Sequence, residues 1–279
     1  MDPLLKGLLW FLPGVIILIL ISLFAFDEDG RMKDNAKHLK RSLWKARGGI
    51  FLLMLVFFAL QIENLVHDLY EPGYRVTGWF YSIEGVSHVV WLQNTFNSDM
   101  MVHFSSVFYI LGLSFFVSLI PPFFILRNEI DLFEEFSKAL AVNYIFLLLG
   151  YFSLHVMVTS YYRPEVQALA YDIPQYRELI LLTNRQTNCF PSGHISLPFS
   201  ITLIALYSAK LKRLAIVGAI FTLMTAFVVI YLGIHWLLDI PAGIAVAVVA
   251  YWTSSTGKID PIFQRLMDFF KNLTESMMK

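Results

Sequence analysis

Charged residues are scarce in this chain of 279 residues, because Asp, Glu, Lys and Arg together make up only 15% of it. A soluble domain carries roughly 25% charged residues. One core could not hide this much apolar surface, so a soluble globule is nearly excluded. The single cysteine, Cys189, rules out an intramolecular disulfide framework and a cysteine-cluster metal site. Basic and acidic residues number 21 each, and this net charge of zero argues against a nucleic-acid partner.

Apolar residues make up 57% of the chain, and its 25 phenylalanines and 13 tyrosines exclude a disordered chain. An apolar run of about 18 or more residues is typical of a membrane-spanning helix. Six or seven candidate runs occur, at about Leu4–Phe26, Gly48–Leu65, His103–Leu126, Leu140–Thr159, His194–Ala209, Leu214–Ile234 and Trp236–Trp252. No small-residue cleavage site follows the first run, so we interpret it as a retained span and not as a signal peptide. The sequence therefore predicts an all-α, polytopic transmembrane helical bundle, organised as a single membrane domain over residues 1–279.

The distribution of Lys and Arg predicts the orientation of this bundle, because short cytoplasmic loops are rich in these residues. The basic block 31–47 is expected in the cytoplasm, either as an amphipathic helix on the inner leaflet or as a solvated loop. The N-terminal spans and this block (about 1–66) precede a catalytic half (about 140–251). Between them, the aromatic-rich outer segment 67–102 is expected to form short interfacial helices. With seven spans, the basic residues on the outer face are only Lys6, Arg75, Arg163, Arg177 and Arg185.

The first candidate catalytic residues are a histidine and a carboxylate near the start of the last run. His235 and Asp239 are four residues apart, so on a helix they would share one face. A carboxylate beside an imidazole selects its tautomer and raises its basicity, which leaves the other ring nitrogen free to attack. This pair therefore predicts a nucleophilic histidine.

Four further residues on the same predicted face fit a phosphate group. Ser192, Gly193 and His194 lie at a helix start, where a hydroxyl and unpaired backbone N–H groups can bind an anion. His194 adds a second imidazole, and Arg163 adds a planar, always-charged fork for phosphate oxygens. Together with His235, these residues indicate phosphoryl transfer through a phosphohistidine, a reaction that requires no metal and no cofactor.

The order of these residues resembles the type 2 phosphatidic acid phosphatase superfamily of membrane lipid phosphatases and phosphotransferases. Arg163-Pro164 matches the end of that family's first motif, and Pro191-Ser192-Gly193-His194 matches its second motif completely. His235 and Asp239 match the end of the third motif, so the resemblance covers about residues 140–251. It implies that His235 is the nucleophile, that Asp239 is its partner and that His194 is the general acid.

The sequence departs from the family pattern at two cationic positions. Val156 stands where the first motif has Lys, and Val228-Val229 stands where the third has Ser-Arg. A phosphate oxyanion needs compensating charge near lipid, so we expect Arg185, in the loop before the second motif, to substitute for one of them. The departures also favour a transferase or an atypical substrate, because sphingolipid-type phosphotransferases resemble this family and lack the full third motif.

Six polar residues near the outer face are a weaker candidate for a divalent metal site. Their spacing fits no recognised motif, so we interpret them as surface residues and expect no metal. They are His67, Asp68, Glu84, His88, Asp99 and His103.

The sequence leaves three functions open. The first is hydrolysis of a lipid phosphate or diphosphate at the extracytoplasmic face of the cell membrane. The second is transfer of a phospho-headgroup to another lipid alcohol. The third is a catalytically silent, lipid-binding protein of the same fold. The expected partners are a lipid phosphate and the membrane; the sequence names neither the lipid nor an oligomeric state.

Overall fold

The computed structural model describes residues 2–27, 29–69, 73–182, 185–257 and 260–277, and it consists almost entirely of helices. Within these residues, five helices are long and apolar enough to cross a membrane. They are α1 (Pro3–Phe26), α3 (Leu39–Leu69), α6 (Asp99–Leu126), α7 (Ile130–Ser153) and α11 (Lys212–Tyr231). The all-α prediction is confirmed, and the chain is an integral membrane protein.

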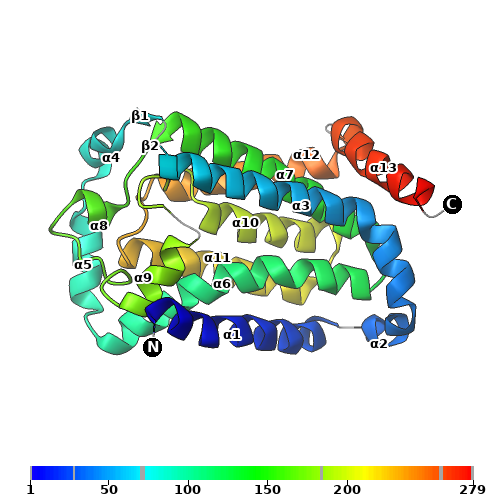
Figure 1. Ribbon diagram of the computed structural model, residues 1–279. Coiled ribbons are helices and arrows are strands. Elements are labelled where there is room, and N and C mark those ends of the chain that lie inside the picture. The colour runs from blue at the N-terminus through cyan, green and yellow to red at the C-terminus, as the bar shows by residue number, and fades with distance from the viewer. Residues whose placement is uncertain (1, 28, 70–72, 183–184, 258–259, 278–279) are drawn as a thin grey trace.

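The other two predicted spans are shorter helices in the same bundle. They are α10 (Gly193–Leu203), which continues into the π-helical η2 (Ile204–Ser208), and α12 (Asp239–Ser255). α10 packs against α7, α11 and α12, and nearly all of its side chains are buried. Figure 1 shows these helices running alongside the five longer ones. The number of crossings therefore stays a prediction.

The short elements gather at the two ends of the bundle (Figure 1). One end carries the start of α1 and the elements β1 (Tyr74–Arg75), β2 (Leu154–His155), α4 (Thr77–Glu84), α5 (Ser87–Thr95), α8 (Thr159–Tyr162) and α9 (Pro174–Leu181). The opposite end carries α2 (Arg31–Asn35), η1 (Ala36–His38) and α13 (Asp260–Ser276). The basic block is helical, in α2, η1 and the first turns of α3, and it lies at the end opposite α4 and α5.

The predicted end of the fourth span, at Thr159, is wrong. α7 ends at Ser153, and the chain then runs extended because it pairs with two other segments. β2 pairs in parallel with β1, and the Val158 N–H donates to the Gln186 carbonyl at 2.9 Å. These backbone partners lie far away in the sequence, so the apolar pattern of the run could not reveal them. The extended segment joins the loop before α10 to this end of the bundle.

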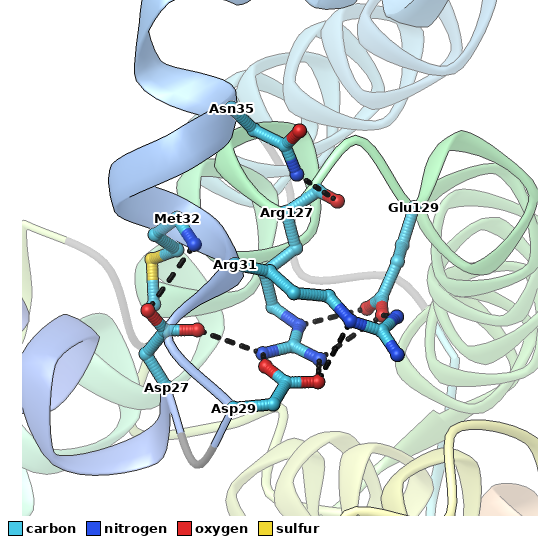
Figure 2. Close-up of polar contacts among 7 residues, drawn as sticks. All are labelled: Asp27, Asp29, Arg31, Met32, Asn35, Arg127 and Glu129. Atoms are coloured by element: carbon cyan, nitrogen blue, oxygen red, sulfur yellow. Dashed lines mark hydrogen bonds and ion pairs between the residues drawn. The ribbon is translucent and has the colours of Figure 1, made fainter.

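Arg127 ties two connections together at the opposite end (Figure 2). It follows α6, and its side chain is only 2% exposed. Its guanidinium donates to Asp27 Oδ1 at 2.9 Å, Asp29 Oδ1 at 2.6 Å and Glu129 Oε2 at 3.1 Å. The Asn35 amide donates to the Arg127 carbonyl at 2.8 Å. One side chain thus holds the α1–α2 connection against the α6–α7 turn.

Replacing Arg127 by Ala is expected to lower the free energy of unfolding by about 3 kcal/mol, because it leaves three clustered carboxylates without their buried cation. Thermal unfolding of the purified protein measures this loss. The matched control is Arg31→Ala, which removes a 58% exposed side chain from the same cluster and should cost under about 1 kcal/mol. Equal losses in the two variants would contradict a special role for Arg127.

The ion pair between Arg127 and Asp29 should respond to acid. The hydrogen bond from Arg127 lowers the pKa of Asp29 below its ordinary value. This pair therefore stabilises the fold fully above the ordinary pKa of about 4, and the contribution is lost as the pH falls through the lower folded value. The difference in stability between the wild-type protein and Arg127→Ala should shrink over that interval.

Candidate active site

His235 lies in the connection between α11 and α12, and Asp239 is the first residue of α12. His235 Nδ1 lies 2.7 Å from Asp239 Oδ2, and the Trp236 N–H donates to the same oxygen at 2.9 Å. His235 precedes the helix, so the two residues do not pair through a shared helix face. The pair forms nevertheless, because a turn at Gly233, with φ of 70°, brings the chain back toward the start of α12.

The second motif meets this pair from the start of α10. Ser192 is the N-cap residue of α10, but its hydroxyl makes no capping bond and lies 3.2 Å from His235 Nε2. The His194 ring lies 6.0 Å from the His235 ring, and it stacks on Tyr109 at 4.3 Å. A Cβ on Gly193 would lie 3.3 Å from the Tyr151 hydroxyl, so this backbone is closely packed. The structure therefore brings the predicted residues of the second and third motifs together.

The imidazole of His235 has a defined set of partners. It is 4% exposed, and Asp239 is fully buried. A carboxylate at a helix N-terminus is stabilised by the backbone dipoles, and an acceptor at Nδ1 selects the tautomer with its proton on that nitrogen. The lone pair of Nε2 then points toward the Ser192 hydroxyl. This is the arrangement that a nucleophilic imidazole requires.

The two predicted phosphate-binding arginines lie in different surroundings. The Arg163 guanidinium pairs with Glu165 at 2.7 Å and lies 4.3 Å over the ring of Tyr81. Arg185 lies within electrostatic range of the buried Glu63 carboxyl. A phosphate contact from either arginine stays a prediction. For Arg163, that contact requires the guanidinium to leave or share its Glu165 partner.

The valines at the positions where the sequence differs from the family motifs are core residues. Val156, Val228 and Val229 are 0–1% exposed and pack in the apolar core at this end of the bundle. The Val229 carbonyl still accepts from the His235 N–H at 3.2 Å. The backbone of this part of the third motif therefore supports His235, while its side chains supply packing in place of charge.

Glu84 is a site residue whose contact the sequence did not reveal. Its carboxylate accepts from the Leu237 N–H at 2.7 Å and from the Leu238 N–H at 3.0 Å. These donors are the next two N–H groups after the one bound by Asp239. Burial raises the pKa of the Glu84 carboxyl, and the charge of Asp239 adds to the effect. Two carboxylates from different elements thus hold the chain that follows His235.

A cavity of about 480 Å³ adjoins the site on the side of His194. It lies among α1, α3, α6, α7, α9 and α10, and Gly193 and His194 form part of its wall. Volumes of 300–1,000 Å³ are typical of ligand pockets. Its other polar lining residues include Glu63, Asn64, Tyr109, Tyr144, Tyr151 and Asn188.

One group of possible metal ligands occurs among the described residues, and it overlaps the site. The ligand atoms of Cys189, His235 and Asp239 lie within 4.8 Å of one another. Burial raises the pKa of the Cys189 thiol. The six outer residues considered for a metal do not form such a group in the part of the chain that is described. The side chain of Asp68, one of the six, lies outside the described residues.

These contacts bring Ser192, His235 and Asp239 together at one buried site. A family model for the PAP2 superfamily matches residues 81–253, which is more than half of the chain. The chain belongs to this superfamily, as the three motifs predict. No curated protein and no solved structure matched the chain. Membership supports action on lipid phosphates in general, and the substrate and the residue roles are matters of proposal.

Proposed function

We propose that this protein hydrolyses a lipid phosphate or diphosphate through a phosphohistidine on His235. The observation that carries the proposal is the buried chain of contacts from Asp239 through His235 to Ser192. Nε2 attacks the terminal phosphorus, a P–N bond forms, and the P–O bond to the leaving group breaks, which is the lipid alcohol in a monophosphate and the lipid monophosphate in a diphosphate. His194 gives its proton to the departing oxygen. Water then cleaves the P–N bond, which releases phosphate and restores the imidazole.

The start of α10 supplies the anion-binding part of this proposal. The first N–H groups of a helix have no acceptor within the helix, and they attract a phosphate together with the backbone dipoles. Gly193 and His194 occupy these positions next to His235. We place this site on the extracytoplasmic face, because the basic block that favours the cytoplasm lies at the other end of the bundle (Figure 1).

Transfer to a second lipid alcohol is the other candidate reaction, because an alcohol that enters the cavity beside His194 after the first alcohol has left would meet the phosphohistidine in place of water. Incubation of the purified protein with isoprenoid and glycerolipid phosphates in EDTA tests both. Free phosphate supports hydrolysis, and a new phospholipid supports transfer. If neither product forms, the chain is a catalytically silent lipid-binding protein and both reactions are rejected.

His194→Ala should lower the rate most for substrates with poor leaving groups, because the proposed task of His194 is to protonate the departing oxygen. An aryl phosphate with a leaving group of low pKa should retain much of its wild-type rate. Parallel kcat measurements on the lipid and the aryl substrate test this. Equal losses on both would reject the general-acid role.

Glu84→Gln should lower kcat about tenfold with little change in KM, because one of two hydrogen bonds to a charged acceptor is lost next to the nucleophile. A pH profile gives a second readout. The pKa of Glu84 is raised. On acidification, its carboxylate is therefore protonated at a higher pH than that of an ordinary glutamate, and it then accepts the two N–H groups less well. The acid-side fall in wild-type activity that this protonation causes should be absent from the variant.

The matched control for this experiment is Glu165→Gln, which changes a partly exposed glutamate paired with Arg163. It is expected to leave the acid limb of the profile in place. An acid limb that persists unchanged in Glu84→Gln would show that Glu84 does not position the His235 connection.

A further inference from the structure

The position of His194 decides where a leaving group must lie. Its ring faces His235 at 6.0 Å, and the same residue forms part of the cavity wall. If His194 protonates the departing oxygen, as in the proposed function on which this inference rests, that oxygen and the alcohol attached to it lie on the cavity side. The cavity is then the place for the non-phosphate part of the substrate.

The cavity wall has an apolar part and a polar part. A large part of it is apolar and comes from the membrane-spanning helices α1, α3 and α6, which suits an alkyl chain. The residues of this part include Leu8, Phe11, Phe57, Leu60, Leu113 and Val117. The remainder carries polar side chains, so the occupant is an amphiphile and not a plain hydrocarbon.

Glu63 is the ionisable member of this polar wall. It belongs to α3, is 3% exposed, and its Oε1 accepts from Asn188 at 2.8 Å and lies 3.1 Å from His67 Nδ1. Arg185 is also within electrostatic range of it. An ionisable residue inside a membrane helix is costly and marks function by default. A carboxylate offers about four acceptor positions, so it can receive a donor from a ligand besides those from the protein.

Glu63 lies toward the phosphate end of the cavity. Its Oε1 accepts from Asn188, and the thiol of the next residue, Cys189, lies within 4.8 Å of the ligand atoms of His235 and Asp239. Tyr151 lines the same cavity. The Tyr151 hydroxyl also packs against Gly193, at the start of α10. A group of the substrate that reaches Glu63 is therefore close to the phosphoester, and not at the far end of the alkyl chain.

We propose that this cavity binds the leaving lipid alcohol, and that Glu63 is a specificity residue that accepts a hydrogen bond from a hydroxyl or amide N–H beside the phosphoester. His67 and Arg185 already lie beside the carboxylate, so a neutral donor suffices and a cationic lipid is not required. A site built to bond a donor discriminates against analogues without one, because its own polar group is then left short of a partner. The preferred substrates are phosphate esters of lipid alcohols that carry such a donor.

A pair of substrates that differ by one methyl group tests this. The first is a 1-acylglycerol 3-phosphate with a free 2-hydroxyl, and the second is its 2-O-methyl ether. The wild-type protein should show a kcat/KM about ten- to a hundred-fold higher for the hydroxyl form, the range of one hydrogen bond to a charged acceptor. Glu63→Gln should lose most of this preference, through a lower kcat/KM for the hydroxyl form alone. The control, Glu165→Gln, should keep the wild-type ratio.

A binding measurement separates this inference from the proposed reaction. In His235→Ala protein, 1-acylglycerol should raise the thermal unfolding temperature more than its 2-O-methyl ether does. The difference should vanish in the His235→Ala/Glu63→Gln double variant. If no lipid phosphate is turned over but this difference is found, the proposed hydrolysis is rejected and the role of Glu63 in binding the lipid alcohol is supported. If the wild-type protein shows no preference for the donor, or if Glu63→Gln leaves the preference unchanged, the inference is overturned.

Discussion

His235→Ala is expected to abolish turnover of every lipid phosphate that the wild-type protein accepts. In the described structure, His235 is the residue whose imidazole has a carboxylate on Nδ1 and a hydroxyl facing Nε2. The other imidazole at the site, His194, stacks on Tyr109 and lies on the cavity wall, so it cannot take over the attack from the same position. Without a nucleophile, the covalent step has no route.

The measurement that checks this is phosphate release, together with trapping of the intermediate. Acid quenching preserves little phosphohistidine, so a radiolabelled substrate should give a phosphoprotein that is stable to base and labile to acid. This label should be absent from His235→Ala. Thermal unfolding near the wild-type temperature would show that the variant is folded. Wild-type rates in this variant would reject the phosphohistidine mechanism.

Asp239→Asn is expected to lower kcat by roughly 10²–10⁴-fold, as removal of the carboxylate does in other His-Asp pairs. An asparagine can keep the local geometry. Its amide oxygen can replace Oδ2, which serves both His235 and the Trp236 N–H. Its amide nitrogen would then replace Oδ1, which is buried and has no hydrogen-bond partner among the described residues. What the substitution removes is the negative charge that stabilises a cationic imidazole.

The rate of formation of the labelled intermediate measures this effect directly, because the charge on His235 grows during the attack. A thermal unfolding temperature close to that of the wild-type protein is the control for geometry. If kcat falls by less than about threefold, Asp239 serves only to position the connection before α12 through the Trp236 N–H.

The sequence alone determined the class of protein and the core of the site. Long apolar runs can exist stably only as membrane helices, and most of the predicted runs coincide with helices of the bundle. The motifs could be recognised from the sequence because of where their residues lie. His235, Asp239 and Ser192 lie at helix boundaries, where local sequence decides which backbone groups are unpaired and which side chains lie beside them. A hydrophobic stretch that ends in such residues indicates a site without knowledge of distant contacts.

Only the tertiary structure decided which distant residues support that core. The bonds from Glu84 join residues more than 150 positions apart, and Asn188 meets Glu63 across 125 positions. From the sequence, Glu84 is only one of several polar residues near the outer face, and Glu63 is not predicted to bind a ligand. The end of α7 was also misplaced, because its next residues pair with β1 rather than continuing the helix. Backbone pairing and buried carboxylate contacts depend on which segments the fold brings together, and no local pattern of hydrophobicity or charge encodes that proximity.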